Sequence, residues 1–477
     1  MAAWDSSSEF PDVPLVCLGA ADGHLAAGRA AGLSGANPRV ARLTLAAALT
    51  VLAGCPSPRS PSVAGGAGVT LEIGRAGSSL AGVAGDGALV FAALTAHPAG
   101  ASAAATTLIE AIRPAAGATA VWHTELAGYG GPLALAGGQV VAALGGAGSV
   151  AGLALRGEPG AAVAALDAAT GAPAWKLAVD ATDWSLITAL AAAGDGVAIA
   201  GSFSGTLRIA DRVVSSAGQT DGFVARLTAA GGLAWLIRVG GPGADAVHGV
   251  AAAGDRIAIA GTFAAGADLL GEPLSPIDER SPRADGFVAE LDPAGARRWV
   301  HSFGGVADDA IAGVAIDAAG RIAVAATAQG TVHVGSVELV ARGAGDGLVA
   351  WWGPGGTVLN AVLLGGDDFD GLRAIAPAGE RVVAAGFYSG SIRLGDRTLT
   401  AGGGDDAFAA ELDATGGVAQ VWSVGGDGRE EITALAAIPG GFVAGVAHTA
   451  GARIDDAALP APPDPMAGAA IAVRPVR

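Results

Sequence analysis

Carboxylates recur at one position of this sequence and are its best candidates for chemistry. Each stands four residues after the end of a Gly-Gly pair, and the four are Asp245, Asp309, Asp370 and Glu430. If they face one rim, they form an acidic arc that suits Ca²⁺ or a cationic partner. Asp and Glu also cap turns and keep rims soluble, and the sequence favours this structural role. The remaining copies of the motif carry Ser78, Gly130 and Ser185 instead.

No other residue pattern indicates a catalytic site. The histidines recur at no common position and form no metal-binding spacing. The sequence has no nucleophile elbow, and its single lysine, Lys176, stands outside any phosphate-binding loop. We therefore expect a protein that is not an enzyme and needs no cofactor, with Ca²⁺ at the acidic position as the one candidate ligand.

A short apolar segment near the N-terminus has the layout of an export signal. Two arginines precede an eleven-residue apolar core, residues 43–53, and Cys55 follows it. The core is too short to cross a bilayer permanently. Leu52, Ala53, Gly54 and Cys55 resemble the lipobox of bacterial lipoproteins, which implies that Cys55 carries the lipid. The alternative, a buried helix with a structural cysteine, would leave Cys55 with nothing to pack against.

The segments on either side of this signal differ from it in composition. Residues 1–37 carry several acidic side chains and show no clear periodicity, so we expect a start codon assigned too early; a disordered extension is the alternative. Residues 38–54 are then the signal peptide. Residues 55–67 are rich in Pro, Ser and Gly, a composition typical of a flexible tether.

From residue 68 onward the sequence is a tandem repeat. Short apolar strands end on a large residue at intervals of 54 to 64 residues, at Ile112, Leu166, Leu227, Leu291, Trp352, Leu412 and Val473. A second apolar run recurs in the same rhythm, so two patterns indicate seven copies. Repeats that contain only short strands are typical of a β-propeller. We predict an all-β, seven-bladed β-propeller of four-stranded blades over residues 68–477.

The two ends of the repeat region predict how the ring closes. Residues 68–73 match the first strand of a copy, and residues 469–476 match the fourth. These strands form a hairpin in every internal copy, so we expect the first and last strands to pair and to remove exposed sheet edges. Tryptophans recur on the strand after the turn and are expected to pack blade against blade, at Trp122, Trp175, Trp235, Trp299 and Trp422.

Two motifs resemble known propeller families. Asp285-Gly-Phe-Val-Ala-Glu-Leu-Asp-Pro-Ala-Gly, followed by Trp299 and Gly304-Gly305, resembles the bacterial seven-bladed β-propeller repeat. Residues 165–175, Ala-Leu-Asp-Ala-Ala-Thr-Gly-Ala-Pro-Ala-Trp, resemble the tryptophan-docking motif of propellers of the pyrroloquinoline-quinone type. The resemblance spans residues 68–477 and implies a fold rather than an activity. Quinone-dependent dehydrogenases of this fold usually carry an adjacent cysteine pair, and no cysteine follows Cys55.

Charge and anchor together suggest a class of function. With 44 acidic and 27 basic side chains the net charge is −17, which repels phosphate backbones, so we expect no nucleic-acid partner. We expect an exported lipoprotein, lipid-anchored to a bacterial membrane on its periplasmic or cell-surface side. Its monomeric, non-catalytic propeller would bind an envelope protein or a surface polymer. The alternative is a propeller enzyme, a hydrolase, lyase or quinoprotein, with its site in the central channel.

Overall fold

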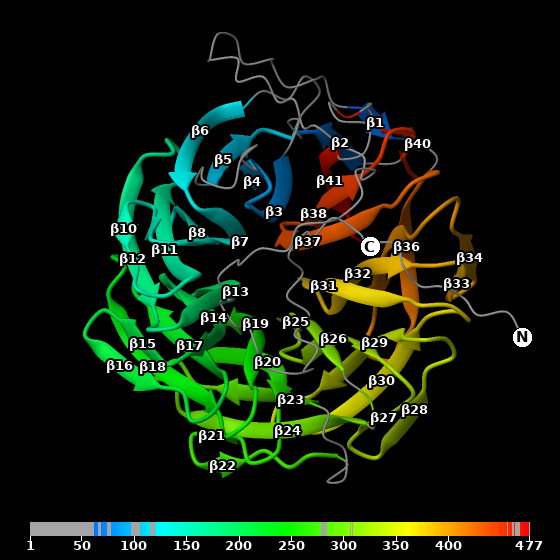
Figure 1. Ribbon diagram of the computed structural model, residues 1–477. Coiled ribbons are helices and arrows are strands. Elements are labelled where there is room, and N and C mark those ends of the chain that lie inside the picture. The colour runs from blue at the N-terminus through cyan, green and yellow to red at the C-terminus, as the bar shows by residue number, and fades with distance from the viewer. Residues whose placement is uncertain are drawn as a thin grey trace, which may run out of the picture. The chain divides into compact units, whose positions relative to one another are not determined.

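β-Strands are the regular elements of this protein. The computed structural model describes residues 62–64, 68–73, 78–96, 105–114, 120–277, 284–305, 307, 309–455, 457–459, 462 and 468–476. All regular elements in this part of the chain are β-strands. These described residues contain no helix long and apolar enough to cross a membrane. Figure 1 shows the strands arranged as blades around one central axis. The all-β class predicted from the sequence is confirmed.

Seven antiparallel blades of four strands form the ring, as predicted. We number the blades in the chain order of their innermost strands and give each from the inside outward. Blade 1 contains β3 (Ser78–Gly85), β4 (Val90–Ala96), β5 (Thr106–Ile112) and β6 (Ala120–Ala127); blade 2 contains β7 (Tyr129–Ala136), β8 (Gln139–Gly146), β11 (Gly160–Asp167) and β12 (Pro173–Asp180); blade 3 contains β13 (Trp184–Ala193), β14 (Gly196–Ser204), β17 (Asp221–Leu227) and β18 (Leu233–Gly240).

The remaining blades follow the same order. Blade 4 contains β19 (Ala246–Ala253), β20 (Arg256–Phe263), β23 (Asp285–Leu291) and β24 (Arg297–Gly305); blade 5 contains β25 (Ala310–Ile316), β26 (Ile322–Ala328), β29 (Asp346–Trp352) and β30 (Val358–Leu364); blade 6 contains β31 (Gly371–Ala378), β32 (Arg381–Tyr388), β35 (Asp406–Leu412) and β36 (Val418–Gly425); blade 7 contains β37 (Glu431–Ile438), β38 (Gly441–His448), β41 (Gly468–Pro475) and β2 (Gly68–Glu72). The sequence repeat is therefore offset by one strand, because each copy begins with the outermost strand of the preceding blade.

The middle strands of each blade are buried on both faces. In β20 all residues except Arg256 and Thr262 are buried, and β23 is buried throughout. The small side chains of Ala258 and Ala260 belong to a core cluster that joins blade 4 to blade 5. Burial on both faces explains why these strands appear in the sequence as continuous apolar runs rather than alternating ones.

A short hairpin between the second and third strands reaches over the preceding blade, a feature that the sequence prediction did not include. In blade 3 this hairpin is β15 (Thr206–Ile209) with β16 (Arg212–Ser215), and β15 pairs with the outermost strand of blade 2. Three further hairpins extend the preceding blade in the same way: β21 (Asp268–Leu269) with β22 (Glu272–Pro273), β27 (Thr331–Val334) with β28 (Val337–Val340), and β39 (Arg453–Ile454) with β40 (Ala457–Ala458). Two others form small separate sheets: β9 (Ser149–Val150) with β10 (Leu153–Ala154), and β33 (Ser391–Leu394) with β34 (Arg397–Thr400). Where they pair, the hairpins cover sheet edges that would otherwise be exposed.

The first and last strands close the ring, as predicted. Strand β2 pairs with β41 and completes blade 7. Strand β1 (Ser62–Ala64), which falls within the segment predicted as a tether, adds to the outer side of β2. The buried side chains of His448 and Glu72 lie 2.8 Å apart (Nε2 to Oε2) and join the end of β38 to the end of β2.

The recurring tryptophans dock one blade onto the next, which confirms their predicted role. The indole N–H groups of Trp122, Trp175 and Trp235 donate to backbone carbonyls in the third-to-fourth-strand turn of the next blade, at 3.0, 2.8 and 2.9 Å. Beneath Trp175, the turn residue Gly231 has φ +79°, and a Cβ there would lie 2.6 Å from the indole ring. The turn needs glycine both for its backbone angle and for this close approach.

Candidate functional site

The recurring acidic position lies inside the joins between blades. Asp245, Asp309, Asp370 and Glu430 each stand between the outermost strand of one blade and the innermost strand of the next. Their exposed fractions are 1%, 5%, 0% and 0%. The four carboxylates thus lie within the ring, at the joins of blades 3 to 7, and not on an open rim.

Backbone N–H groups hold these carboxylates in place. Asp245 accepts hydrogen bonds from the N–H groups of Gly241 and Ala264, both at 2.7 Å. Asp370 accepts equivalent bonds from Gly366 and Ser389, at 2.5 and 3.1 Å. Because Ala264 and Ser389 directly follow the second strand, each carboxylate ties the loop that enters a blade to the loop that leaves its second strand. This is the turn-capping role that the sequence favoured.

A second carboxylate, which sequence reasoning missed, lies beside each of the first. These residues begin the third strands, at Asp221, Asp285, Asp346 and Asp406. Asp221 accepts hydrogen bonds from the Arg238 guanidinium at 2.5 Å and from the Ala217 N–H at 3.0 Å through the same oxygen, Oδ2. Among the described residues, its Oδ1 and the Oδ1 of Asp346 are buried without a hydrogen-bond partner. Their recurrence at the start of the same strand was the signal that could have found them.

The Gly-Gly pairs leave room for both carboxylates. Gly240 has φ +149°, and a Cβ there would lie 2.8 Å from the Asp221 carboxyl carbon and 2.9 Å from Asp245 Oδ2. Gly304, one blade further on, has φ +146° and lies between Asp285 and Asp309 in the same way. Any side chain would displace a carboxylate, which explains why the glycines recur with the acids.

Burial alters the ionisation of the paired acids. Burial raises the pKa of Asp245 to about 6, against the hydrogen bonds of Ala264 and Gly241, and the charge of Asp221 adds to the rise. Burial also raises the pKa of Asp370 to about 6, and the neighbouring Asp346 contributes. The pKa of Asp406 rises to about 6 because of burial, and this carboxyl group also hydrogen-bonds Glu430. At these three joins two neighbouring acids thus repel each other when both are ionised.

The innermost strands, which surround the central axis in Figure 1, each contain a β-bulge near the start. The extra residues are Ala81, Thr188, His248, Ala312, Arg373 and Thr433, and in β7 the pair Gly131 and Pro132. A bulge re-aims a side chain and is common beside functional sites. Here the equivalent bulge positions carry side chains that range from alanine and threonine to histidine and arginine.

Four of these bulge residues make polar contacts, of which the longest is the 3.4 Å bond from Thr433 Oγ1 to the Gly445 carbonyl. Thr188 Oγ1 donates to the Val247 carbonyl of the next inner strand at 2.7 Å. His248 Nε2 lies 3.0 Å from Thr262 Oγ1, and burial lowers the pKa of this imidazole to about 4, so it is neutral at neutral pH. Arg373 Nε donates to Glu431 on the next inner strand at 2.6 Å.

An aromatic and charged cluster lies where blades 5, 6 and 7 meet. The Arg373 guanidinium lies 4.7 Å from the centroid of the Phe387 ring, and the Phe369 ring packs against Phe387 at 5.6 Å. Phe369, in the loop before β31, is 40% exposed, whereas Phe387 is buried. We call Phe369, Arg373, Phe387 and Glu431 the Phe369 cluster; it holds an exposed ring beside a fixed ion pair.

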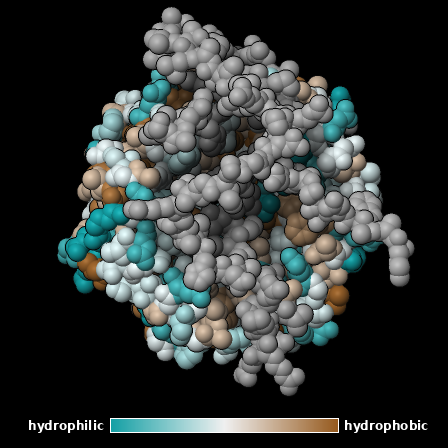
Figure 2. Space-filling view, in the orientation of Figure 1, coloured by the Kyte–Doolittle hydropathy of each residue, from teal (hydrophilic) through white to brown (hydrophobic). Residues whose placement is uncertain are grey.

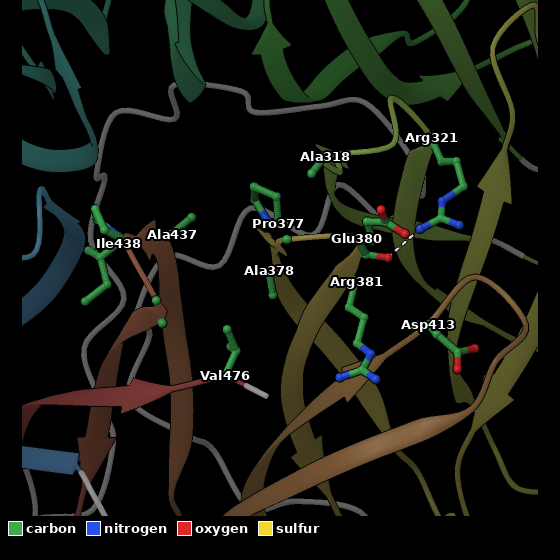
Figure 3. A pocket seen from close by; sticks show the side chains of 14 residues that line it. Ala318, Arg321, Pro377, Ala378, Glu380, Arg381, Asp413, Ala437, Ile438 and Val476 are labelled. Atoms are coloured by element: carbon green, nitrogen blue, oxygen red, sulfur yellow. Dashed lines mark hydrogen bonds between the residues drawn. The ribbon is translucent and has the colours of Figure 1, made fainter.

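A cavity lies at the opposite end of the inner strands. Its volume is about 910 Å³, and turns of blades 5, 6 and 7 line it. Figure 3 shows the Arg321 side chain directed at Glu380, whose backbone carbonyl accepts a hydrogen bond from it. Arg381 donates to Glu411 at 2.9 Å. Both arginines of this cavity are therefore held by hydrogen bonds to neighbouring residues.

The described surface is mixed in character. Figure 2 shows hydrophilic and hydrophobic residues interspersed around the face in view. Large hydrophobic side chains are exposed at positions spread over most of the blades: Val121, Tyr129, Val213, Leu270, Ile277, Val340, Leu359 and Phe369. Of these, Phe369 packs its ring against the buried ring of Phe387.

Cys55 and the lipobox residues Leu52, Ala53 and Gly54 lie outside the residues that the structure describes. Across the described residues, no three His, Cys, Asp or Glu side chains gather in a way that would hold a metal ion.

Comparisons with known proteins add no family. No protein-family model matches the chain, and no curated protein matches it significantly. Similar solved structures include a europium-containing methanol dehydrogenase, at 11% identity and a TM-score of 0.38, covering 85% of this chain and 92% of the other. A polysaccharide lyase described as an ulvan lyase matches at 10% identity and a TM-score of 0.41, covering 76% of this chain and 88% of the other. The Vibrio cholerae biofilm matrix protein Bap1 matches at 11% identity and a TM-score of 0.26, covering 86% of this chain and 87% of the other.

Proposed function

We propose that this protein is a membrane-anchored envelope lipoprotein whose propeller binds or scaffolds an envelope protein or a surface polymer without catalysis. The observation that carries the binding role is the Phe369 cluster. An exposed aromatic ring that is already packed loses little conformational freedom when a partner covers it. Such rigid aromatic anchors beside arginine are typical of the residues that dominate binding energy.

The position of the cluster supports this proposal. Phe369 precedes the innermost strand of blade 6, and Arg373 and Glu431 lie on the innermost strands of blades 6 and 7. The two charged side chains are 24% and 17% exposed, so a partner that covers the ring also reaches the ion pair. An apolar surface next to hydrogen-bonding groups suits a protein side chain or a sugar ring.

The anchor belongs to the same proposal. Lipidation at Cys55 would hold the domain at a membrane, and two acyl chains are needed for stable attachment. Strand β2 begins at Gly68, so 12 residues, 56–67, separate it from Cys55. A ring tied this closely to the bilayer would act near the membrane surface.

The alternative is a propeller enzyme, a hydrolase, lyase or quinoprotein, with a site in the central channel. The bulge residue His248 favours it, because a half-buried neutral imidazole on an innermost strand is able to bind or orient a substrate. The ring of bulge residues contains no second histidine and no carboxylate among the described residues, so His248 would need partners from elsewhere.

In-cell crosslinking followed by purification tests the proposal. The tagged full-length protein would be crosslinked in intact cells beside two variants, Cys55→Ser and Phe369→Ala. We expect one dominant partner that Cys55→Ser loses through mislocalisation and Phe369→Ala reduces at least about tenfold, the effect of roughly 1.4 kcal/mol. A partner retained in full by both variants would contradict the proposal.

A further inference from the structure

We propose that a divalent cation, Ca²⁺ foremost, binds between the two carboxylates at each of two blade joins, Asp221 with Asp245 and Asp346 with Asp370. The first pair joins blade 3 to blade 4, and the second joins blade 5 to blade 6. This inference is independent of partner binding at the Phe369 cluster, since it concerns how the ring is held together.

The first argument is a buried oxygen without a partner at each join. Asp221 and Asp346 are both 0% exposed. Each has one oxygen, Oδ2, that accepts a backbone N–H, and within the described structure the other oxygen, Oδ1, accepts nothing. An unsatisfied buried carboxylate oxygen is costly, and native proteins normally supply it with a donor, water or ion.

The second argument is convergence on one small space. A Cβ on Gly240 would lie 3.1 Å from Asp221 Oδ1 and 2.9 Å from Asp245 Oδ2, so both carboxylates border the space beside this glycine. At the second join, Gly365 adjoins Asp346 Oδ1 and Gly366 lies next to Asp370 Oδ2. At the first join the unpartnered oxygen of Asp221 thus borders the same space as the Asp245 carboxylate, and at the second join the carboxylates of Asp346 and Asp370 lie beside consecutive glycines.

The third argument distinguishes a cation from a shared proton. A shared proton requires direct contact between the carboxyl groups, as in the Asp406–Glu430 pair, where the two side chains hydrogen-bond each other. In the described structure no such bond joins Asp221 to Asp245 or Asp346 to Asp370; the charges only repel. These two pairs therefore lack a direct bond between their carboxyl groups, and a bridging cation would offset their repulsion.

Charge favours a cation as that group. Arg238 neutralises Asp221 at 2.5 Å, but Arg342 Nε lies 3.9 Å from Asp346 and its side chain is 52% exposed. The chain as a whole carries a net charge of −17. Ca²⁺ accepts carboxylate, carbonyl and water oxygens in flexible geometry, and extracellular Ca²⁺ sites bind at about 10⁻⁴–10⁻³ M. Two carboxylates supplemented by carbonyls or water suit a site in this range.

Equilibrium dialysis of the folded full-length protein against about 5 mM CaCl₂, a concentration above the expected dissociation constants, tests the inference. The variants are Asp221→Asn, Asp346→Asn and the double variant, because each amide keeps an oxygen for the bond from Ala217 or Arg342. Asp195→Asn is the matched control, since that side chain is 77% exposed and belongs to neither join. Circular dichroism first establishes that each variant is folded.

We expect bound Ca²⁺ to fall by one per chain in each single variant and by two in the double variant, with Asp195→Asn unchanged. Ca²⁺ should also raise the unfolding temperature of the wild type, and chelation should reverse the rise. The absence of saturable Ca²⁺ binding to the wild type would overturn the inference, whether or not the variants fold. The same stoichiometry in wild type and folded single variants would overturn it equally.

Discussion

At the scale of single residues, the structure explains a pattern whose meaning the sequence left open. The recurrence of Asp245 and its equivalents after Gly-Gly was visible in the sequence. Their burial was not, because the carboxylate beside Asp245 is Asp221, which comes from the third strand of the preceding blade. Only the closed ring brings the two together around Gly240. A contact between residues of two blades cannot be recognised from a local sequence pattern.

Substitution of Gly240 tests the crowding at the join. Gly240→Ala should destabilise the protein by about 2–4 kcal/mol, because the new Cβ would meet both carboxylates and the backbone angle is strained for any other residue. Gly254→Ala is the control, since Gly254 has φ +59° and nothing within 4 Å of its Cβ position. It should lose only about 1 kcal/mol. Equal losses in chemical denaturation would contradict this account of the join.

At the scale of elements, strands and ring closure were predictable and the inserted hairpins were not. Middle strands such as β20 have long apolar runs that recur with the repeat. The hairpin β15–β16 has two strands of only four residues, and six of their eight positions are partly or fully exposed. Its pairing with β12 of the neighbouring blade depends on tertiary structure. Short strands with a distant partner give too weak a pattern to recognise.

The docking tryptophans provide a prediction at this scale. Trp235→Ala should cost about 2–3 kcal/mol, because it removes the packing on Gly295 and the hydrogen bond to the Pro293 carbonyl. Trp235→Phe keeps most of the packing and should lose about 1 kcal/mol. Chemical denaturation of both variants measures the difference. Equal losses would mean that the hydrogen bond alone docks blade 3 on blade 4.

At the scale of the whole molecule, the buried side chains of His448 and Glu72 join distant parts of the chain where the ring closes. Burial disfavours protonation of His448, but the hydrogen bond and charge of Glu72 outweigh it, and the Thr449 carbonyl and Glu430 add to the rise, so the pKa of His448 is raised. The protonated imidazole can donate to both Glu72 and the Thr449 carbonyl. The pair links strand β2, next to the predicted tether, to strand β38 of the same blade.

This pair predicts how stability changes with pH. Because the folded protein holds the His448 proton more tightly than the unfolded chain, its contribution is full below about pH 6.5 and is lost as pH rises through the raised pKa. Glu72→Gln should lower stability and weaken that dependence. Unfolding free energies measured at several pH values between about 5.5 and 8.5 bracket this range. An identical pH dependence in both proteins would exclude the pair as its source.

The propeller fold was predictable because seven copies repeat the same evidence, whereas a binding site occurs once and has no repeat to reveal it. Phe369 and Arg373 stand at positions where other blades carry unrelated residues, and only the structure brings them together over Phe387. The account therefore depends most on whether this part of the ring meets a partner.

A photo-crosslinking amino acid placed at position 369 in living cells tests that claim most directly. The same probe at Glu380, beside the cavity at the opposite end of the inner strands, is the control. We predict one dominant adduct from position 369, absent from position 380 and lost when Cys55→Ser releases the anchor. Adducts from position 380 alone, or none from either position, would contradict the proposal that this protein is an anchored binding propeller.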